Sequence, residues 1–185
     1  MYAAESSSTQ QTFEQIEQEL GAGMVPRIFK LLEPQPALLN HLWGQFRTIV
    51  IQGYLPRVLK ELVGLVVATA THCDYVKVVH LHSLTLQGMD QQALDAVKQG
   101  NYDTEQLSTT VKEALRFAVL ATATRTAYSP VEDQQTWQEL RQQTAQVLEH
   151  IGLEEEEKFE LVATVALFEQ ICTVANLLNL DPNQP

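Results

Sequence analysis

The feature that most constrains the fold of this chain is the spacing of its prolines and glycines. Pro26, Pro36 and Pro56 each stand before a run of apolar residues at helical spacing, and glycines such as Gly21 and Gly88 follow where a run ends. Proline suits the first helical position and glycine the position just past the last. β-Hairpin signals are absent from the sequence. We therefore predict an all-α protein of about eight helices, near residues 13–20, 36–53, 56–70, 72–87, 90–100, 108–128, 129–150 and 154–180, with a further short helix near 26–32.

Three polar segments indicate where helices begin. Asp90 is placed to cap the helix that follows it, and Ser129–Glu132 has the pattern of a capping box with proline in the first turn. The acidic run Glu154–Glu157 suits the positive end of a helix dipole. The valine-rich run Leu62–Val67 could be taken for a strand, but its flanking residues favour a helix.

Length and composition are those of an ordinary globular protein. With 185 residues, of which 45% are hydrophobic, the chain can bury a substantial core as one domain. No linker rich in glycine, serine or proline divides it. We predict a single domain over residues 1–185, with residues 1–12 and 181–185 flexible.

The charge balance excludes several classes of partner. Twelve basic residues stand against 23 acidic ones, which gives a net charge of −11. Nucleic-acid binders and proteins that bind anionic membranes need basic surfaces, so neither partner is expected. The sequence also shows no apolar stretch of the length that spans a bilayer and no signal peptide. We therefore expect a cytoplasmic location.

The segment from Pro56 to Gly88 contains the residues best suited to chemistry. Thr71 has the spacing of a helix N-cap, which would place Cys73 in the first turn, where the helix dipole lowers a thiol pKa. His80 follows Cys73 by seven residues, on the same helical face. Glu61 lies one turn into the preceding helix and reaches this face if the two helices pack as a hairpin. Glutamate, histidine and cysteine together can form a thiol relay.

Structural interpretations of the same residues are more frequent when spacing alone is considered. A lone cysteine or histidine on an apolar helix more often packs than reacts. His72, Cys73, His80 and His82 do not have the spacing of zinc ligands, and no metal site is expected. The chain has two cysteines, which cannot make a disulfide framework.

An internal repeat of spacing involves both cysteines. Glu61-Leu62-Val63 begins twelve residues before Cys73, and Glu160-Leu161-Val162 begins twelve residues before Cys172. Glu-Leu-Val is a common helical triplet. We therefore attribute no function to the repeat and favour chance as its origin, while allowing an old duplication of a helix.

These residues resemble the alkylhydroperoxidase AhpD-like branch of the carboxymuconolactone decarboxylase family. The resemblance is carried by Gly53–Val63, then His72–Val76, His80 and Gly88, and it extends to 26–43 and 152–178. It implies a compact AhpD-like helical domain without a bound cofactor, and a homo-oligomer, often a trimer or hexamer. It also implies catalytic roles for Glu61, Cys73 and His80.

One position departs from the family pattern. Redox-active members have a second cysteine three residues after the first, and that position is Val76 here. The last helix departs as well, with Glu169, Cys172 and Thr173 where the family often has asparagines and an arginine. Both departures imply that the ancestral peroxidase-type reaction is lost or replaced.

We favour a protein of redox ancestry with a degenerate one-cysteine site, and we keep two alternatives. The favoured function is a peroxidase-type oxidoreductase with one working thiol, Cys73, resolved by an external thiol donor or by Cys172. The first alternative is a decarboxylase-like enzyme that transfers protons through His80 and Glu61, with Arg57, Lys60 or Lys77 as the cation that binds an acidic substrate. The second alternative is a non-catalytic helical oligomer or binding protein.

Overall fold

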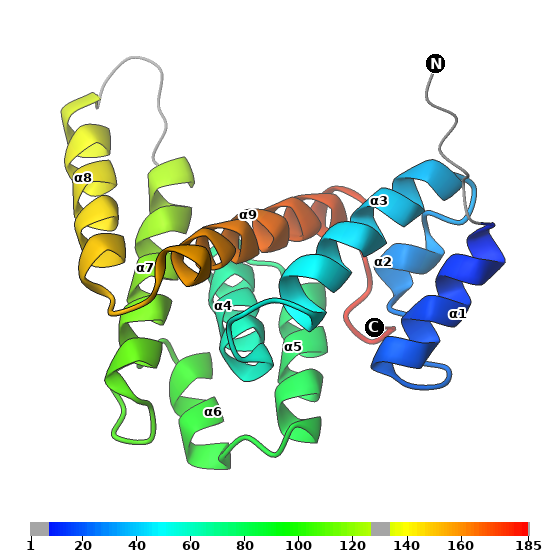
Figure 1. The fold of residues 1–185 in the computed structure, drawn as a ribbon, viewed down its shortest axis with the longest axis horizontal. Coiled ribbons are helices and arrows are strands. Elements are labelled where there is room, and N and C mark those ends of the chain that lie inside the picture. The colour runs from blue at the N-terminus through cyan, green and yellow to red at the C-terminus, as the bar shows by residue number, and fades with distance from the viewer. Residues whose placement is uncertain (1–7, 127–133, 185) are drawn as a thin grey trace.

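The computed structural model describes residues 8–126 and 134–184, and every regular element in these ranges is helical (Figure 1). The predicted all-α fold is therefore confirmed. The elements are α1 (Thr9–Leu20), α2 (Arg27–Lys30), α3 (Pro36–Phe46), the π-helical turn η1 (Arg47–Ile51), α4 (Arg57–Ala70), α5 (Asp74–Leu86), α6 (Gln91–Lys98), α7 (Thr109–Thr126), α8 (Gln134–His150) and α9 (Glu155–Leu177).

Most of the predicted helix starts are found in the structure. Asp90 caps α6 by accepting a hydrogen bond from the backbone N–H of Ala93 at 2.9 Å. Glu154 and Glu157 form a capping box at the start of α9. The capping box predicted at Ser129–Glu132 lies outside the described residues.

The structure describes part of each end of the chain. Residues 9–12 form the first turn of α1, which Ser8 and Gln11 close with a capping box. Residues 181–184 form a turn in which Asp181 accepts hydrogen bonds from Asn183 and Gln184. Both ends therefore hold local hydrogen-bonded structure where the structure describes them.

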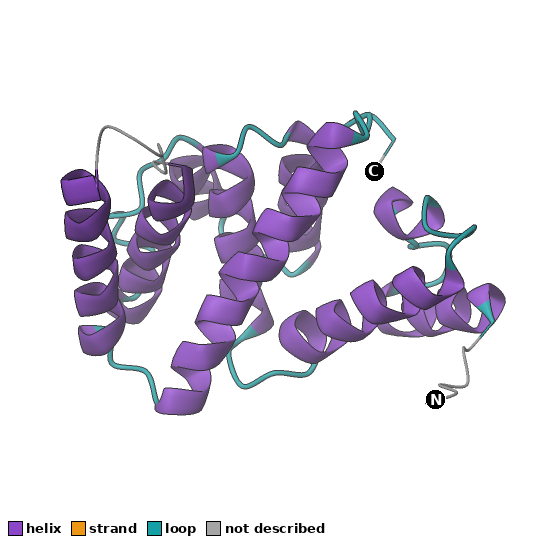
Figure 2. Cartoon of the chain, turned by 90° about the horizontal axis from the view of Figure 1, so that it is seen from above, coloured by secondary structure: helices purple, strands orange, loops and turns teal. Residues whose placement is uncertain are grey.

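Helix α4 lies at the centre of the fold. It packs against α5, α6, α7 and α9, and every residue from Leu59 to Ala68 is buried. The valine-rich run is thus a core helix, as its flanks predicted. Figure 1 shows α4 and α5 as a hairpin, with α7 and α8 paired on one side and α1 to α3 on the other. In Figure 2, α9 is seen to cross between these two groups.

Helix α9 is long and apolar enough to cross a membrane by length and composition alone, which the sequence analysis did not anticipate. In its most apolar window, 56% of the residues are buried inside the described chain. A core helix passes the same test, and α9 packs against α4, α5 and α7.

A buried ion pair joins α9 to the start of α4. Lys60 Nζ lies 2.7 Å from Glu160 Oε1, and the two side chains are 1% and 8% exposed. Glu160 also accepts hydrogen bonds from the backbone N–H groups of Tyr54 and Leu55. A Cβ at Gly53 would lie 2.0 Å from Glu160 Oε1, so only glycine leaves room for this carboxylate.

We expect Lys60→Met to lower the free energy of unfolding by about 3–5 kcal/mol, because it leaves Glu160 buried without its counter-charge. Urea unfolding measures the change. The matched control is Lys158→Met, which breaks the surface pair of Lys158 with Glu155 and should cost at most about 1 kcal/mol. Equal losses in the two variants would contradict the role given to the buried pair.

Candidate active site

The turn between α4 and α5 places Cys73 at the start of α5. Helix α4 ends at Ala70, with Thr71 as its C-cap, and α5 begins at Asp74, with Cys73 as its N-cap. The predicted N-cap at Thr71 is therefore wrong. His72 adopts a left-handed conformation with φ of 52°, which breaks the helix between Thr71 and Cys73. The Thr71 hydroxyl donates instead to the carbonyl of Val67.

The hairpin of α4 and α5 brings Glu61 and His80 together, as the sequence predicted. His80 Nδ1 lies 2.5 Å from Glu61 Oε2, and both side chains are less than 5% exposed. A carboxylate so close to Nδ1 accepts a hydrogen bond from the protonated nitrogen and fixes the orientation of the ring. The other ring nitrogen, Nε2, has no hydrogen-bond partner among the described residues. This nitrogen is left to exchange a proton with a ligand.

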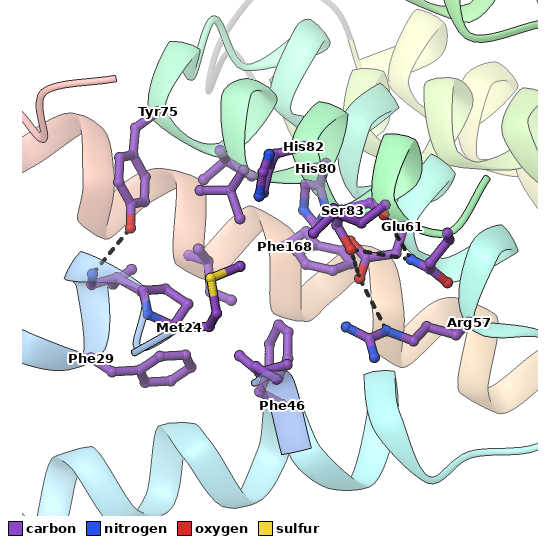
Figure 3. A pocket seen from close by; sticks show the side chains of 18 residues that line it. Met24, Phe29, Phe46, Arg57, Glu61, Tyr75, His80, His82, Ser83 and Phe168 are labelled. Carbon is purple, nitrogen blue, oxygen red and sulfur yellow. Dashed lines mark hydrogen bonds and ion pairs between the residues drawn. The ribbon is translucent and has the colours of Figure 1, made fainter. Parts of the chain in front are cut away.

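Two further side chains bind the second oxygen of Glu61. The Ser83 hydroxyl donates to Glu61 Oε1 at 2.9 Å, and Arg57 Nε lies 3.4 Å from the same oxygen. Gln87 in turn donates to the Ser83 hydroxyl at 3.1 Å. The carboxylate is thus surrounded by donors from both helices, as Figure 3 shows.

These donors decide the ionisation of Glu61. Burial by itself raises the pKa of Glu61, but the hydrogen bond and charge of His80, the hydrogen bond of Ser83 and the charge of Arg57 outweigh burial. The pKa of Glu61 therefore lies below its ordinary value. Glu61 is therefore an anion at neutral pH.

The His80 ring fits between a glycine of α4 and an aromatic ring of α9. A Cβ at Gly64 would lie 2.3 Å from His80 Nε2 and 2.6 Å from its Cε1. On another side, the His80 ring meets Phe168 edge to face, with 4.5 Å between ring centroids. These contacts restrict the imidazole to one position. A ring held in place in this way is pre-organised for proton transfer.

Glu61 and His80 line a cavity of about 240 Å³. Its walls come from α1 to α5 and α9 and are mostly apolar, with Met24, Phe29 and Phe46 facing Phe168 across the space (Figure 3). The Tyr75 hydroxyl accepts a hydrogen bond from the backbone N–H of Ile28 and so ties α5 to α2. Apolar walls with a few converging polar groups are typical of small-molecule sites.

Cys73 lies behind this cavity and does not line it. The wall at this point is formed by Val76, three residues after Cys73 in the sequence. Cys73 is 0% exposed, and the neighbouring side chain of Cys172 in α9 lowers its pKa. The structure thus joins Glu61 with His80 and joins Cys73 with Cys172, but it does not bring all three predicted site residues to one surface.

The candidate cations occupy three different environments. Arg57 lines the cavity, whereas Lys60 is buried against Glu160 and Lys77 pairs with Asp74 at 3.0 Å. His82, expected on a different face from His80, also lines the cavity from an exposed position. No group of three or more potential ligands in the part of the chain that the structure describes could hold a metal ion.

The sequence analysis missed Ser83 and Gln87 as members of the site. Both follow His80 on one helical face, three and seven residues later, which is the spacing that places side chains side by side. The spacing that places Ser83 and Gln87 beside His80 is thus visible in the sequence. Polar residues on the same helical face as a candidate catalytic histidine can be predicted as members of its site.

The sequence and the fold match known proteins. Residues 36–119 match the profile of the carboxymuconolactone decarboxylase family. No curated protein matches the sequence.

Solved structures share the fold at low sequence identity. A peroxidase-related protein from Silicibacter sp. TM1040 has a TM-score of 0.73 at 19% identity, covering 95% of this chain and 85% of its own. A peroxidase-related protein with an alkylhydroperoxidase AhpD core, from Ralstonia eutropha JMP134, has a TM-score of 0.71 at 18% identity, covering 91% and 82%. A cysteine-to-alanine variant of the debrominase Bmp8, in complex with 2,3,4-tribromopyrrole, has a TM-score of 0.72 at 17% identity, covering 99% and 91%.

We expect Gly64→Ala to lower the free energy of unfolding by about 1–3 kcal/mol, because the added methyl group overlaps the His80 ring. Gly44→Ala is the matched control, since nothing lies within 4 Å of a Cβ at this position of α3. It should stabilise the helix by about 0.5–1 kcal/mol. Thermal and urea unfolding measure the free energy of unfolding of both variants. Similar changes in the two would show that His80 is not held against Gly64.

The lowered pKa of Glu61 makes a prediction for stability in acid. The charged carboxylate stabilises the folded state fully above its ordinary pKa of 4.5, and this contribution is lost as the pH falls through the lowered folded-state pKa. Glu61→Gln should therefore flatten the fall of unfolding free energy between about pH 5 and pH 3. Asp103→Asn, at a fully exposed carboxylate paired with Lys112, should change the profile less. An unchanged slope in Glu61→Gln would refute the assignment.

Proposed function

We propose that this chain, whose residues 36–119 match the profile of the carboxymuconolactone decarboxylase family and whose fold is shared by peroxidase-related proteins, is an enzyme of proton transfer. Its substrate would be a small, largely apolar ring compound with one carboxylate. The observation that carries the proposal is the buried contact of His80 with Glu61 at the wall of an apolar cavity.

The geometry supports a general acid–base role for His80. With Nδ1 held by Glu61, Nε2 of the neutral ring takes a proton from a carbon next to a carbonyl group, and the electron pair of that C–H bond moves into the carbonyl. The anion of Glu61 stabilises the imidazolium that forms. Where a C=C bond is conjugated with the resulting enolate, Nε2–H returns the proton to the far carbon of that bond, and the electron pair held by the carbonyl moves back to form the new double bond. The double bond of the substrate is thereby shifted, and His80 is restored.

Arg57 is the proposed contact for the substrate carboxylate. It is the one lysine or arginine among the cavity-lining residues that the structure describes, and its side chain is 36% exposed. Its Nε faces Glu61, which leaves the terminal guanidinium nitrogens for a second, bidentate partner. Binding there would place the ring of the substrate against Phe46 and Phe168.

The cavity limits the size of this substrate. Cavities of about 150 Å³ take benzene, so about 240 Å³ suits a molecule of one or two small rings. A variant of the debrominase of the same fold forms a complex with 2,3,4-tribromopyrrole, which is a small, single-ring ligand. That likeness supports the size proposed for the ligand.

Peroxidase-type chemistry inside the cavity has less support. A peroxide bound there would need a thiol, and none of the lining residues that the structure describes is a cysteine. Reduction of peroxides through Cys73 therefore stays a prediction. It would require a peroxide to reach the buried thiol behind Val76. The alternative, a non-catalytic binding protein or oligomer, predicts that the protein does not accelerate hydrogen exchange in any substrate.

Exchange of substrate hydrogens in D₂O tests proton transfer directly. The protein is incubated with a panel of lactone acids and small ring carboxylic acids, and proton NMR follows the C–H next to the carbonyl. His80→Gln should slow exchange by about 10²- to 10⁴-fold, and Arg57→Met should mainly raise KM. His41→Gln, at an exposed position of α3, is the control. Exchange no faster than in buffer, or unchanged exchange in His80→Gln, would refute proton transfer at His80.

A further inference from the structure

Helix α5 lines the cavity with two rows of side chains. One row is Tyr75, Val79, His82 and Leu86, and the other is Val76, His80, Ser83 and Gln87. Residues three or four positions apart lie above one another on a helix, so each row runs along the helix axis. Tyr75 stands at the start of the row beside that of His80, and proton transfer at His80 gives it no role.

The Tyr75 hydroxyl uses its oxygen to hold the cavity wall together and leaves its hydrogen unused. Tyr75 is 3% exposed, and its oxygen accepts a hydrogen bond from the backbone N–H of Ile28 at 3.2 Å. No acceptor for the hydroxyl hydrogen is found among the residues that the structure describes. A buried donor without an acceptor costs free energy. A ligand in the cavity that accepts this hydrogen removes the cost.

The polar side chains around His80 have already engaged their hydrogens. The Ser83 hydroxyl donates to Glu61 Oε1, and His80 Nδ1 meets Glu61 Oε2. Nε2 of a neutral His80 has no hydrogen to donate. Within the described chain, Tyr75 is therefore the buried cavity-lining side chain that can give a hydrogen to a ligand.

This hydroxyl keeps its hydrogen at neutral pH. Burial raises the pKa of Tyr75 above its ordinary value, although the backbone N–H groups of Ile28 and Arg27 and the charge of Arg27 oppose the shift. Tyr75 is thus a neutral hydrogen-bond donor and not a phenolate.

Tyr75 and Arg57 lie at opposite ends of the cavity, as Figure 3 shows. Ser83, which donates to the same oxygen of Glu61 that Arg57 faces, follows Tyr75 by eight residues, or about 12 Å along the helix axis. A hydrogen bond of about 2.9 Å at each end leaves roughly 6 Å for the ligand. A six-membered ring with substituents at opposite positions, or a compound of two small rings, spans a length of this order.

We propose that Tyr75 is a specificity-determining residue whose hydroxyl donates a hydrogen bond to an uncharged oxygen of the ligand, such as a ketone, at the end away from the carboxylate. The acceptor is uncharged because Arg57 is the one lysine or arginine among the described lining residues. A second anionic group beside Tyr75 would be buried without a counter-charge. The inference rests on the proposed function for the ring carboxylic acid as ligand, but it does not require His80 to transfer a proton.

Binding of two matched pairs of acids tests the proposal. Calorimetry compares 4-oxocyclohexanecarboxylic acid with 4-methylenecyclohexanecarboxylic acid, and 6-acetyl-2-naphthoic acid with 6-isopropenyl-2-naphthoic acid. In each pair a C=O group is exchanged for a C=CH₂ group of nearly the same shape. Tyr75→Phe removes the hydroxyl, so it should lower the ratio of ketone affinity to alkene affinity about 3- to 10-fold in at least one pair.

Two control variants separate this effect from other losses. Tyr54→Phe, at a tyrosine that is 75% exposed, should leave the affinity ratio unchanged. Arg57→Met should weaken both members of a pair alike, because it removes the contact for the shared carboxylate. A ratio that Tyr75→Phe leaves unchanged in both pairs would overturn the proposal.

NMR of the wild-type complex keeps the test decisive if Tyr75→Phe fails to fold. The carbonyl carbon of the bound ketone, labelled with carbon-13, should resonate downfield of its position in an apolar solvent, and protons beside the ketone should show nuclear Overhauser contacts to the Tyr75 ring. A ketone bound away from Tyr75 would refute the assignment. Failure of proton transfer appears separately, as unchanged hydrogen exchange in His80→Gln with the affinity ratio intact. Binding of none of the four acids would overturn the ligand class and this inference together.

Discussion

Two adjacent charged residues on a fully buried helix determine much of this structure. Lys60 and Glu61 lie in the part of α4 that is covered on all sides, and a buried charge without a partner is strongly destabilising. Each finds its partner on a different helix: Lys60 meets Glu160 of α9, and Glu61 meets His80 of α5. The requirement to pair both charges therefore sets how α5 and α9 pack on the central helix.

The same packing separates two kinds of chemistry. The Glu61 and His80 contact opens onto an apolar cavity, whereas the thiols of Cys73 and Cys172 lie behind its wall. Val76 forms the boundary between them. The cavity therefore holds acid–base groups and, among the lining residues that the structure describes, no thiol.

Local rules predicted the helices well because prolines, glycines and capping residues act within a few positions. They failed at Thr71, whose capping pattern is outweighed by the left-handed turn at His72. The pairing of Glu61 with His80 was predictable from a helical hairpin. The contact of Cys73 with Cys172, and the burial of Lys60 rather than its access to ligands, depend on the path of α9, which the spacing of residues within the sequence does not specify.

The tautomer of His80 tests the central claim most directly, since proton transfer requires Nδ1 to be bonded to Glu61 and Nε2 to be free. Nitrogen-15 NMR of the imidazole in the full-length protein distinguishes the two nitrogens. The structure predicts that neutral His80 carries its proton on Nδ1, with Nε2 as the unprotonated nitrogen, and that Glu61→Gln weakens this preference. A neutral His80 protonated on Nε2, or a ring that averages between both tautomers, would contradict the account.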